Sequence, residues 1–217
     1  CFRMKNMGLS VRQIEKGIND CTEQEVAEML QQRENVLQSQ LHEQQMHLQG
    51  LQNLRVALRL CEQGEWSVRT VPDVWYLPHT IGKEFVQDSR ICDQLPQWLD
   101  WMPVVTSAQI VRGNDAHAEH MEWGLGLEQA EAALLGFAPQ EPAQLLHLGR
   151  VLEIYCSWEI PAEHGSEKGL YQYCMERARA LNLVPEPVMF RRVFCYTKKG
   201  GTKQVHNVLR VPVKMAE

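Results

Sequence analysis

"TEQEVAEMLQQRENVLQSQLHEQQMHLQGLQNLRVALRLCE", residues 22–62, contains no proline and decides how the chain is organised. Thr22 and Glu25 form a capping box, the pattern that satisfies the first backbone N–H groups of a helix. A single helix through this stretch would extend roughly 60 Å at 1.5 Å per residue, which exceeds the ordinary length of helices in globular proteins. The stretch therefore predicts one long helix, which Gly64 ends.

The apolar residues of this helix follow a heptad pattern and form a narrow stripe. Ala27 shares the stripe, and Gln44 and Arg55 interrupt it. The other positions are mostly Gln, Glu, Arg and His, which a globular core would not bury. We therefore expect a homodimeric coiled coil; the alternative is a helix folded back on its own chain. The predicted dimerisation residues are Leu30, Leu37, Leu41, Leu48, Leu51 and Leu58.

The opening residues 1–20 differ from the rest of the chain in charge, because basic residues outnumber Glu15 before residue 20. Gly8 is placed to end a first short helix, and Ser10 with Gln13 forms a second capping box. We expect a short helical hairpin here. Its basic residues are Arg3, Lys5, Arg12 and Lys16.

Composition sets the class of protein. The chain has 217 residues with 44% hydrophobic and 23% charged residues, enough for one sizeable core and an additional element. A net charge of -5 argues against the chain as a whole binding nucleic acid. No apolar run approaches the roughly 20 residues of a membrane span, and no export signal is visible, so we expect no membrane contact and a cytoplasmic location. The seven cysteines lack a C-x-x-C pair, which argues against disulfides and a zinc site.

Residues 64–217 differ in composition from the helix before them: they contain short β-rich runs and all the prolines. An order of strand, helix, strand, strand occurs twice, at about 65–128 and 146–214. A duplicated α+β unit favours a continuous or pseudo-symmetric sheet with helices on one face and a ligand on the other face or between the halves. The predicted elements are strands at 68–77, 108–112, 120–127, 148–158, 188–197 and 203–213, helices at 85–101 and 169–181, a short helix in the connector, and a hairpin turn at Gly200–Gly201.

Two motifs resemble a known family. "FRMKNMGLSVRQIEKG", residues 2–17, resembles the segment that follows the winged helix-turn-helix of MerR-type bacterial transcription regulators, in which a long dimerising helix comes next. "VLRVPVK", residues 208–214, is similar to the end of GyrI-like effector-binding domains, which form the C-terminal part of one branch of that family. The resemblance covers the chain in element order.

The resemblance implies three segments: 1–20 adjoining a DNA-binding domain, a dimerisation helix at 21–63, and an effector-binding domain at 64–217. It implies promoter DNA as a partner, bound by a winged helix-turn-helix that precedes residue 2, and a small organic effector as the ligand. No cofactor is implied.

The strands of residues 64–217 suggest where an effector would bind. Alternation along residues 190–196 puts Arg192 among aromatic residues on one face, with Arg191 and Cys195 on the other. Aromatic walls with one or two buried charges suit flat organic molecules, whereas each aromatic taken alone could equally be a core residue. Gly124 and Gly126 would allow a close approach to the backbone. The predicted ligand-binding residues are Tyr76, Trp101, Trp123, Glu153, Tyr155, Arg192, Phe194 and Tyr196.

The charge of the effector stays open. Relatives that bind cationic drugs place a glutamate on the penultimate strand, just before a tyrosine, where this chain has Arg192-Val193-Phe194. If Arg192 faces the pocket, a planar anionic or neutral ligand is preferred, because an unpaired buried guanidinium is costly. If Arg192 is exposed, Glu153 or Glu122 can supply the counter-charge for a cation.

A metal site is the weaker interpretation of the segment GNDAHAEH. His117 and His120 lie beside Asp115 and Glu119, but the segment reads as a polar loop that enters a strand, and no fourth ligand is identifiable. Metal sensing would require cysteines clustered at the end of the long helix, and Cys61 alone lies there.

An enzyme is also the weaker interpretation. Some stand-alone relatives of GyrI-like domains are enzymes, and Cys156 or Cys195 could serve as a nucleophile beside a histidine. The alternation places Cys156 with Leu152 and Ile154 on the helix-covered side, and it places Cys195 on the packed side as well. A thiol in such surroundings is inert. We therefore expect a ligand sensor without catalytic residues.

Overall fold

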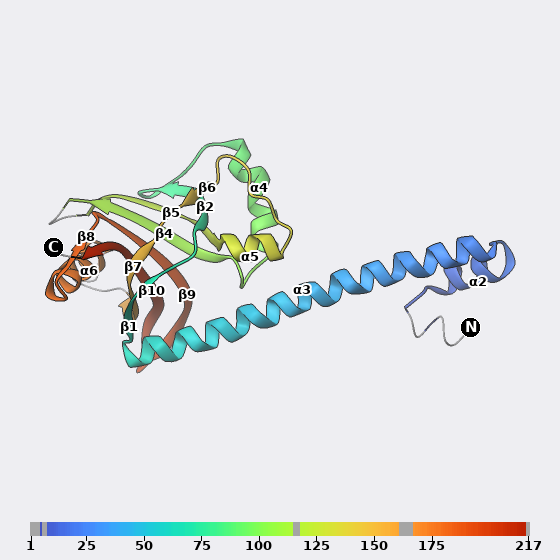
Figure 1. Cartoon of the computed structure of the whole chain (residues 1–217), viewed down its shortest axis with the longest axis horizontal. Helices are drawn as coiled ribbons and strands as arrows, with labels where there is room; N and C mark the ends of the chain where they lie inside the picture. Colours follow the sequence, from blue (N-terminus) through green and yellow to red (C-terminus); the bar gives the residue numbers. More distant parts are fainter. Residues whose placement is uncertain (1–4, 6–7, 115–117, 161–166, 216–217) are drawn as a thin grey trace. The chain divides into compact units, whose positions relative to one another are not determined.

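A computed structural model describes residues 5, 8–114, 118–160 and 167–215, and it shows an α+β protein with a long helix followed by a strand-rich domain (Figure 1). The predicted fold class is confirmed. The chain divides into two compact units, residues 1–48 and 49–217, with the division inside the long helix. The two units are described separately below.

The first unit contains helix α2 (Val11–Asn19) and the beginning of helix α3 (Glu23–Gln63). Both predicted capping boxes are formed. The backbone N–H of Gln13 donates to the Ser10 hydroxyl at 3.3 Å, and the Thr22 N–H donates to the Glu25 carboxylate at 2.7 Å. Gly8 has φ +80°, as expected for a residue that ends a helix, but the helix predicted before it lies mostly outside the described residues.

Helix α3 forms as one continuous element, which confirms the prediction from residues 22–62. Gly64 ends it with φ +63°, and the Glu65 N–H donates to the Leu60 carbonyl at 3.1 Å. The last turns of the helix pack within the second unit, where Ala57 and Cys61 are buried and the Cys61 thiol lies 3.3 Å from the Asn207 carbonyl. The second compact unit therefore contains the last turns of α3 together with the strand-rich domain.

The heptad leucines of α3 remain largely uncovered. Leu58, at the end that packs in the second unit, is half-buried. The other five have exposed fractions of 37% for Leu30, 43% for Leu37, 60% for Leu41, 56% for Leu48 and 56% for Leu51. These values leave an apolar stripe on the single chain.

The strands form one sheet with the order β1-β7-β10-β9-β4-β5-β2-β3, while β6 pairs with β2 and β8 pairs with β10. The order β7-β10-β9 of the second half mirrors β2-β5-β4 of the first half, and antiparallel β4 and β9 join them. The predicted continuous sheet is confirmed. The bounds are β1 Trp66–Thr70, β2 Val74–Ile81, β3 Glu84–Phe85, β4 Thr106–Gly113, β5 Ala118–Glu128, β6 Gln144–Leu146, β7 Arg150–Ile160, β8 Leu183–Pro185, β9 Val188–Lys199 and β10 Thr202–Met215.

Two predicted elements were wrong. The single strand at 68–77 is two strands, because Pro72 lies between β1, which pairs with β7, and β2, which pairs with β5. The helix predicted from Phe85 begins later: Phe85 belongs to β3, and helix α4 spans Ser89–Asp100. Asp88 caps α4, and its carboxylate accepts a hydrogen bond from the Arg90 N–H at 2.9 Å.

Each face of the sheet has its own core. Helix α6 (Glu167–Ala180) covers one face, where Cys174 and Met175 pack with Leu152, Ile154 and Leu209. This confirms the predicted helix-covered side of β7. The buried residues on the opposite face are Val71, Val74, Tyr76, Ala108, Ile110, Leu148, Val151 and Phe190. The remaining helix, α5 (Gln129–Leu134), follows β5 directly and corresponds to the short helix predicted in the connector.

No helix in the described ranges is long and apolar enough to cross a membrane.

Gly124 is required by close packing within the sheet. A Cβ atom there would lie 2.3 Å from the Leu77 carbonyl oxygen and 2.7 Å from the Tyr76 ring. We predict that Gly124→Ala lowers the free energy of unfolding by about 2–4 kcal/mol, because backbone and a buried ring must shift. The control Gly136→Ala has open space around its Cβ and φ +62°, and it should cost only about 1–2 kcal/mol. Urea unfolding measures both, and equal losses would contradict the prediction.

Candidate ligand-binding site

A pocket of about 210 Å³ lies in the second unit, between the sheet face opposite α6 and the last turns of α3. Its walls are mainly apolar: they come from the segment Met102–Val105 that follows α4, from α3 and from β9. One basic side chain, Arg192, and one carboxylic acid, Glu131, also contribute to the lining. The lining residues are Gly50, Asn53, Leu54, Met102, Pro103, Val104, Val105, Thr106, Ser107, Glu131, Arg192, Val193, Phe194, Cys195 and Tyr196.

Arg192 is buried at the pocket, with 8% of the residue exposed. It lies on β9 next to Ala108 of β4, so it sits at the junction of the two halves of the sheet. Its Nε donates to the Thr106 hydroxyl at 2.9 Å, and its Nη1 donates to the Glu128 carboxylate at 2.8 Å. Arg192 therefore lines the pocket as a guanidinium that is already paired with Glu128.

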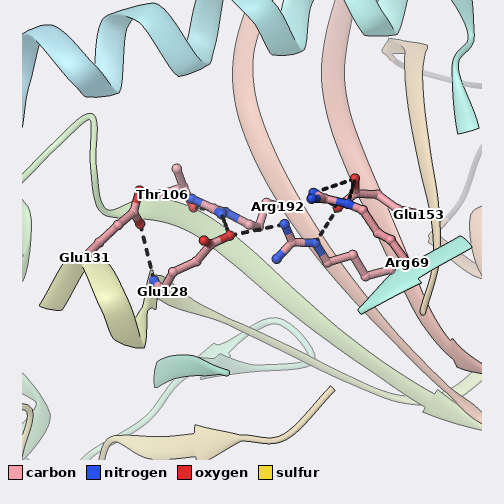
Figure 2. A network of polar contacts seen from close by, with 7 residues as sticks. Arg69, Thr106, Glu128, Glu131, Glu153 and Arg192 are labelled. Carbon is pink, nitrogen blue, oxygen red and sulfur yellow. Dashed lines mark hydrogen bonds and ion pairs between the residues drawn. The ribbon is translucent and has the colours of Figure 1, made fainter. Parts of the chain in front are cut away.

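Arg192 belongs to a buried network of alternating charges (Figure 2). One oxygen of Glu128, Oε1, accepts from both Arg192 and Arg210, the latter at 3.1 Å. The Nε of Arg210 donates to Glu153 at 2.8 Å, and Arg69 donates two hydrogen bonds to the same carboxylate at 2.8 and 3.0 Å. The network runs from β1 through β7, β10 and β9 to the end of β5.

Glu128 and Glu131, the two acids at the start of α5, have pKa values that are shifted in opposite directions. Burial raises the pKa of Glu128, but the charges of Arg192 and Arg210 outweigh it and hold this pKa below its usual value. Burial also raises the pKa of Glu131; Arg192 opposes this shift and the charge of Glu128 adds to it, so the pKa ends above its usual value. The carboxylate of Glu131 accepts from the Glu128 N–H at 3.4 Å (Figure 2).

A β-bulge in β9 changes the predicted alternation. Val193 pairs with Asn207 and Cys195 pairs with His206, so Phe194 is an extra residue in the strand. Cys195 therefore lies on the same face of the sheet as Arg192. The prediction that Cys195 lies on the packed face was wrong.

The bulge also moves Tyr196 to the other face. Tyr196 pairs with Val205, whose second partner Trp158 packs in the α6-side core, and paired residues share a face. The prediction that Tyr196 shares the Arg192 face was wrong, although Tyr196, with 61% of the residue exposed, still contributes to the lining. Phe194 stays at the pocket and stacks on Tyr155, with ring centroids 6.3 Å apart.

The other predicted ligand-binding residues lie away from the lining. Tyr76 is fully buried in the core opposite α6, and its hydroxyl donates to the Glu122 carbonyl at 3.0 Å. The Arg191 guanidinium lies over the Trp123 ring at 5.2 Å. Trp101 caps the end of α4, and Glu153 is buried in the charge network.

The close approach expected at Gly124 and Gly126 is made by the sheet itself. The Tyr76 ring lies against Gly124, and Phe190 and Ala108 lie against Gly126.

Neither proposed counter-charge for a cation is free at the pocket. Glu153 binds Arg69 and Arg210, as described above. Glu122 accepts from Arg112 at 3.0 Å and contacts His120 at 2.7 Å. His120 is thus engaged with a carboxylate, whereas Asp115 and His117 lie outside the described residues.

The thiols considered as nucleophiles are poorly suited to catalysis. Burial raises the pKa of Cys156 to about 12, and burial also raises the pKa of Cys195. A thiol with a raised pKa carries little of the reactive thiolate at neutral pH. His206, the cross-strand partner of Cys195, is bound instead to the hydroxyls of Ser157 at 2.8 Å and Thr197 at 2.7 Å.

Sequence reasoning missed Glu128, which binds Arg192, and the neighbouring Glu131 and Arg210, which both contact Glu128. Glu128 and Glu131 fall in the connector that follows the strand predicted at 120–127, and Arg210 lies within the closing motif VLRVPVK. Alternation along β10 places Arg210 between buried residues, which was the available signal. Nothing local in the sequence indicated that these side chains meet.

Comparisons with known proteins give structural alignments of low score and low identity. No family model matches the chain, and no curated protein matches it. The structure reported as "Cryo-EM structure of EcmrR-DNA complex in EcmrR-RPo" aligns over 99% of this chain and 81% of that chain, with 12% identity and a TM-score of 0.39. The crystal structure of the EcmrR C-terminal domain aligns over 70% of this chain and 99% of that chain, with 9% identity and a TM-score of 0.42. Alignments with such identities and TM-scores assign neither a fold family nor a role to this chain.

The charge network predicts a strong dependence of stability on Glu153. Glu153→Gln removes the charge that Arg69 and Arg210 share, and we expect a loss of about 2–4 kcal/mol in the free energy of unfolding. The control Glu186→Gln breaks an exposed pair with Lys214, in which both side chains are well solvated, and should cost less than about 1 kcal/mol. Urea unfolding at pH 7 measures both variants, and a Glu153 effect no larger than the control would contradict the network's role.

The opposite pKa shifts of Glu131 and Glu128 predict opposite pH effects. Because the folded-state pKa of Glu131 is raised, ionising it opposes folding, so Glu131→Gln should stabilise the protein at pH 7 and give no gain at pH 3.5. The folded-state pKa of Glu128 is lowered, so Glu128→Gln should cost most at pH 7 and less on acidification. Urea unfolding at the two pH values measures both effects, and a gain from Glu131→Gln that is larger at pH 3.5 would contradict the prediction.

Proposed function

We propose that this chain is the dimerising and effector-binding part of a ligand-responsive transcription regulator of the MerR type, with a GyrI-like domain at residues 64–217. In this proposal a homodimer forms through α3, and promoter DNA is bound by the winged helix-turn-helix that the opening motif implies. A small aromatic molecule in the pocket alters how the dimer acts on the promoter. The protein acts in the cytoplasm and needs no cofactor.

The observation that carries the proposal is the exposed leucine stripe of α3. Five leucines at heptad spacing have exposed fractions of 37–60%, although their helix is otherwise rich in Gln, Glu and Arg. Leaving such a stripe in water is unfavourable by roughly 25 cal/mol per Å² of apolar area. Pairing with the same stripe of a second copy removes this area from water, which is the packing of a coiled coil.

The pocket supports the effector part of the proposal. It is concave and mostly apolar, and it has a small number of fixed polar groups, which is the usual make-up of a small-molecule site. Arg192 is held in one orientation by Thr106 and Glu128, so its remaining N–H groups are positioned before a ligand arrives. The alternative of a hydrolytic enzyme would use Cys156 or Cys195, and their raised pKa values speak against it.

The dimer is testable by changing the stripe. Leu41→Glu/Leu48→Glu places charges in the predicted seam, whereas Gln32→Glu/Ser39→Glu adds the same charges at exposed positions on the outer side of the helix. Sedimentation equilibrium should give about twice 25.0 kDa for the unchanged chain and for the control. The leucine variant should associate at least ~100-fold more weakly, because a buried charge costs several kcal/mol. Circular dichroism checks that both variants fold; equal dimerisation of the two would contradict the proposal.

A further inference from the structure

We propose that the ligand of this pocket is a flat aromatic molecule of one or two rings that carries a single carboxylate, with the carboxylate bound by Arg192. This inference rests on the proposed function, since it names the chemical class of the effector. It follows from the donors, the charges and the size of the pocket.

The arginines offer more donors than the network's acids accept. The hydrogen bonds of Arg192 use Nε and Nη1, which leaves the two N–H groups of Nη2 for another acceptor. Arg210 has 4% of its side chain exposed, and its Nη1 is buried without a hydrogen-bond partner among the described residues. A buried guanidinium nitrogen without an acceptor is costly, and of the two arginines Arg192 is the one that lines the pocket, so its Nη2 is the donor available to a ligand there.

The charges give the same answer. Three guanidinium groups, from Arg69, Arg192 and Arg210, are matched by two ion-paired carboxylates, Glu128 and Glu153. The third acid, Glu131, also lines the pocket, and burial raises its pKa, so its charged form is less favoured there than in water. Among the ion-paired groups the arginines therefore outnumber the carboxylates, which favours an anionic ligand beside Arg192.

A carboxylate also fits the shape of the free donors. Guanidinium and carboxylate are both planar, and they form paired N–H···O bonds that a rounder or singly accepting group cannot. A cationic ligand would instead have to lie beside the guanidinium of Arg192, with Glu131 as the nearest acid in the lining. Burial disfavours the charged form of that carboxyl group, and therefore the ion pair that would hold a cation.

The walls and volume limit the rest of the ligand. Phe194 stacks on Tyr155, and Val104 and Val105 provide apolar contacts on the side of the segment after α4. A volume of about 210 Å³ lies below the roughly 300–1,000 Å³ of sites for drug-sized molecules. The pocket therefore suits one or two rings.

The experiment compares three probes of the same ring system and different charge: 2-naphthoate, neutral 2-naphthamide and cationic 2-naphthylmethylammonium. Isothermal titration calorimetry of the full chain at pH 7 should give at least tenfold tighter binding of 2-naphthoate than of either other probe. In Arg192→Gln this preference should fall to less than twofold. Arg112→Gln, which removes a half-exposed guanidinium outside the lining, should keep it.

Arg192→Lys provides a second variant if Arg192→Gln does not fold, as judged by circular dichroism. This variant keeps the positive charge but loses the paired, coplanar N–H donors of the guanidinium. We therefore expect 2-naphthoate to bind it at least fivefold more weakly than the unchanged chain. It should still bind 2-naphthoate more tightly than 2-naphthamide. Tighter binding of the cation, or an unchanged preference in the Arg192 variants, would overturn the inference and leave the proposed sensor standing. Binding of none of the three probes would count against the inference and against an aromatic effector altogether.

Discussion

The carboxylate of Glu128 is the contact on which the pocket depends. It comes from the end of β5 in the first half of the sheet, and one of its oxygens accepts hydrogen bonds from Arg192 and Arg210, both from the second half. The pairing of β4 with β9 brings the halves into one sheet, and this carboxylate ties them together on the face opposite α6. Because it also fixes Arg192, the same contact that joins the halves prepares the polar end of the pocket.

The proposed function places two different demands on the chain. The stripe of α3 must stay apolar and exposed so that a second copy can cover it, whereas the pocket must keep charges buried without leaving them unpaired. The network meets the second demand by alternating guanidinium and carboxylate groups, so that Glu128 and Glu153 are each paired with two arginines. The β-bulge at Phe194 adds an aromatic wall beside Arg192 and brings Cys195 to the same side.

The predictable parts of this structure are those that local sequence determines. The capping boxes at Ser10 and Thr22 and the residue Gly64 define where the helices begin and end. Strand alternation correctly predicted which of residues 152–156 face helix α6. Alternation failed at Tyr196, because a bulge depends on the pairing partner and leaves no clear local mark. The contacts of Arg192 and Arg210 with Glu128 could not be predicted either, because Glu128 lies 64 and 82 residues away from them in the sequence. Of the eight predicted ligand-binding residues, those on β9 line the pocket, while Tyr76, Trp123 and Glu153 serve the core and its charge network.

Diffraction from crystals of the full chain with 6-bromo-2-naphthoate tests the central claim most directly, because bromine can be located by its anomalous signal. The account predicts one bromine site among the apolar walls of the pocket, with the carboxylate within about 3 Å of the Arg192 guanidinium. A bromine site on another face of the sheet or along the leucine stripe of α3, with Arg192 unchanged, would contradict it.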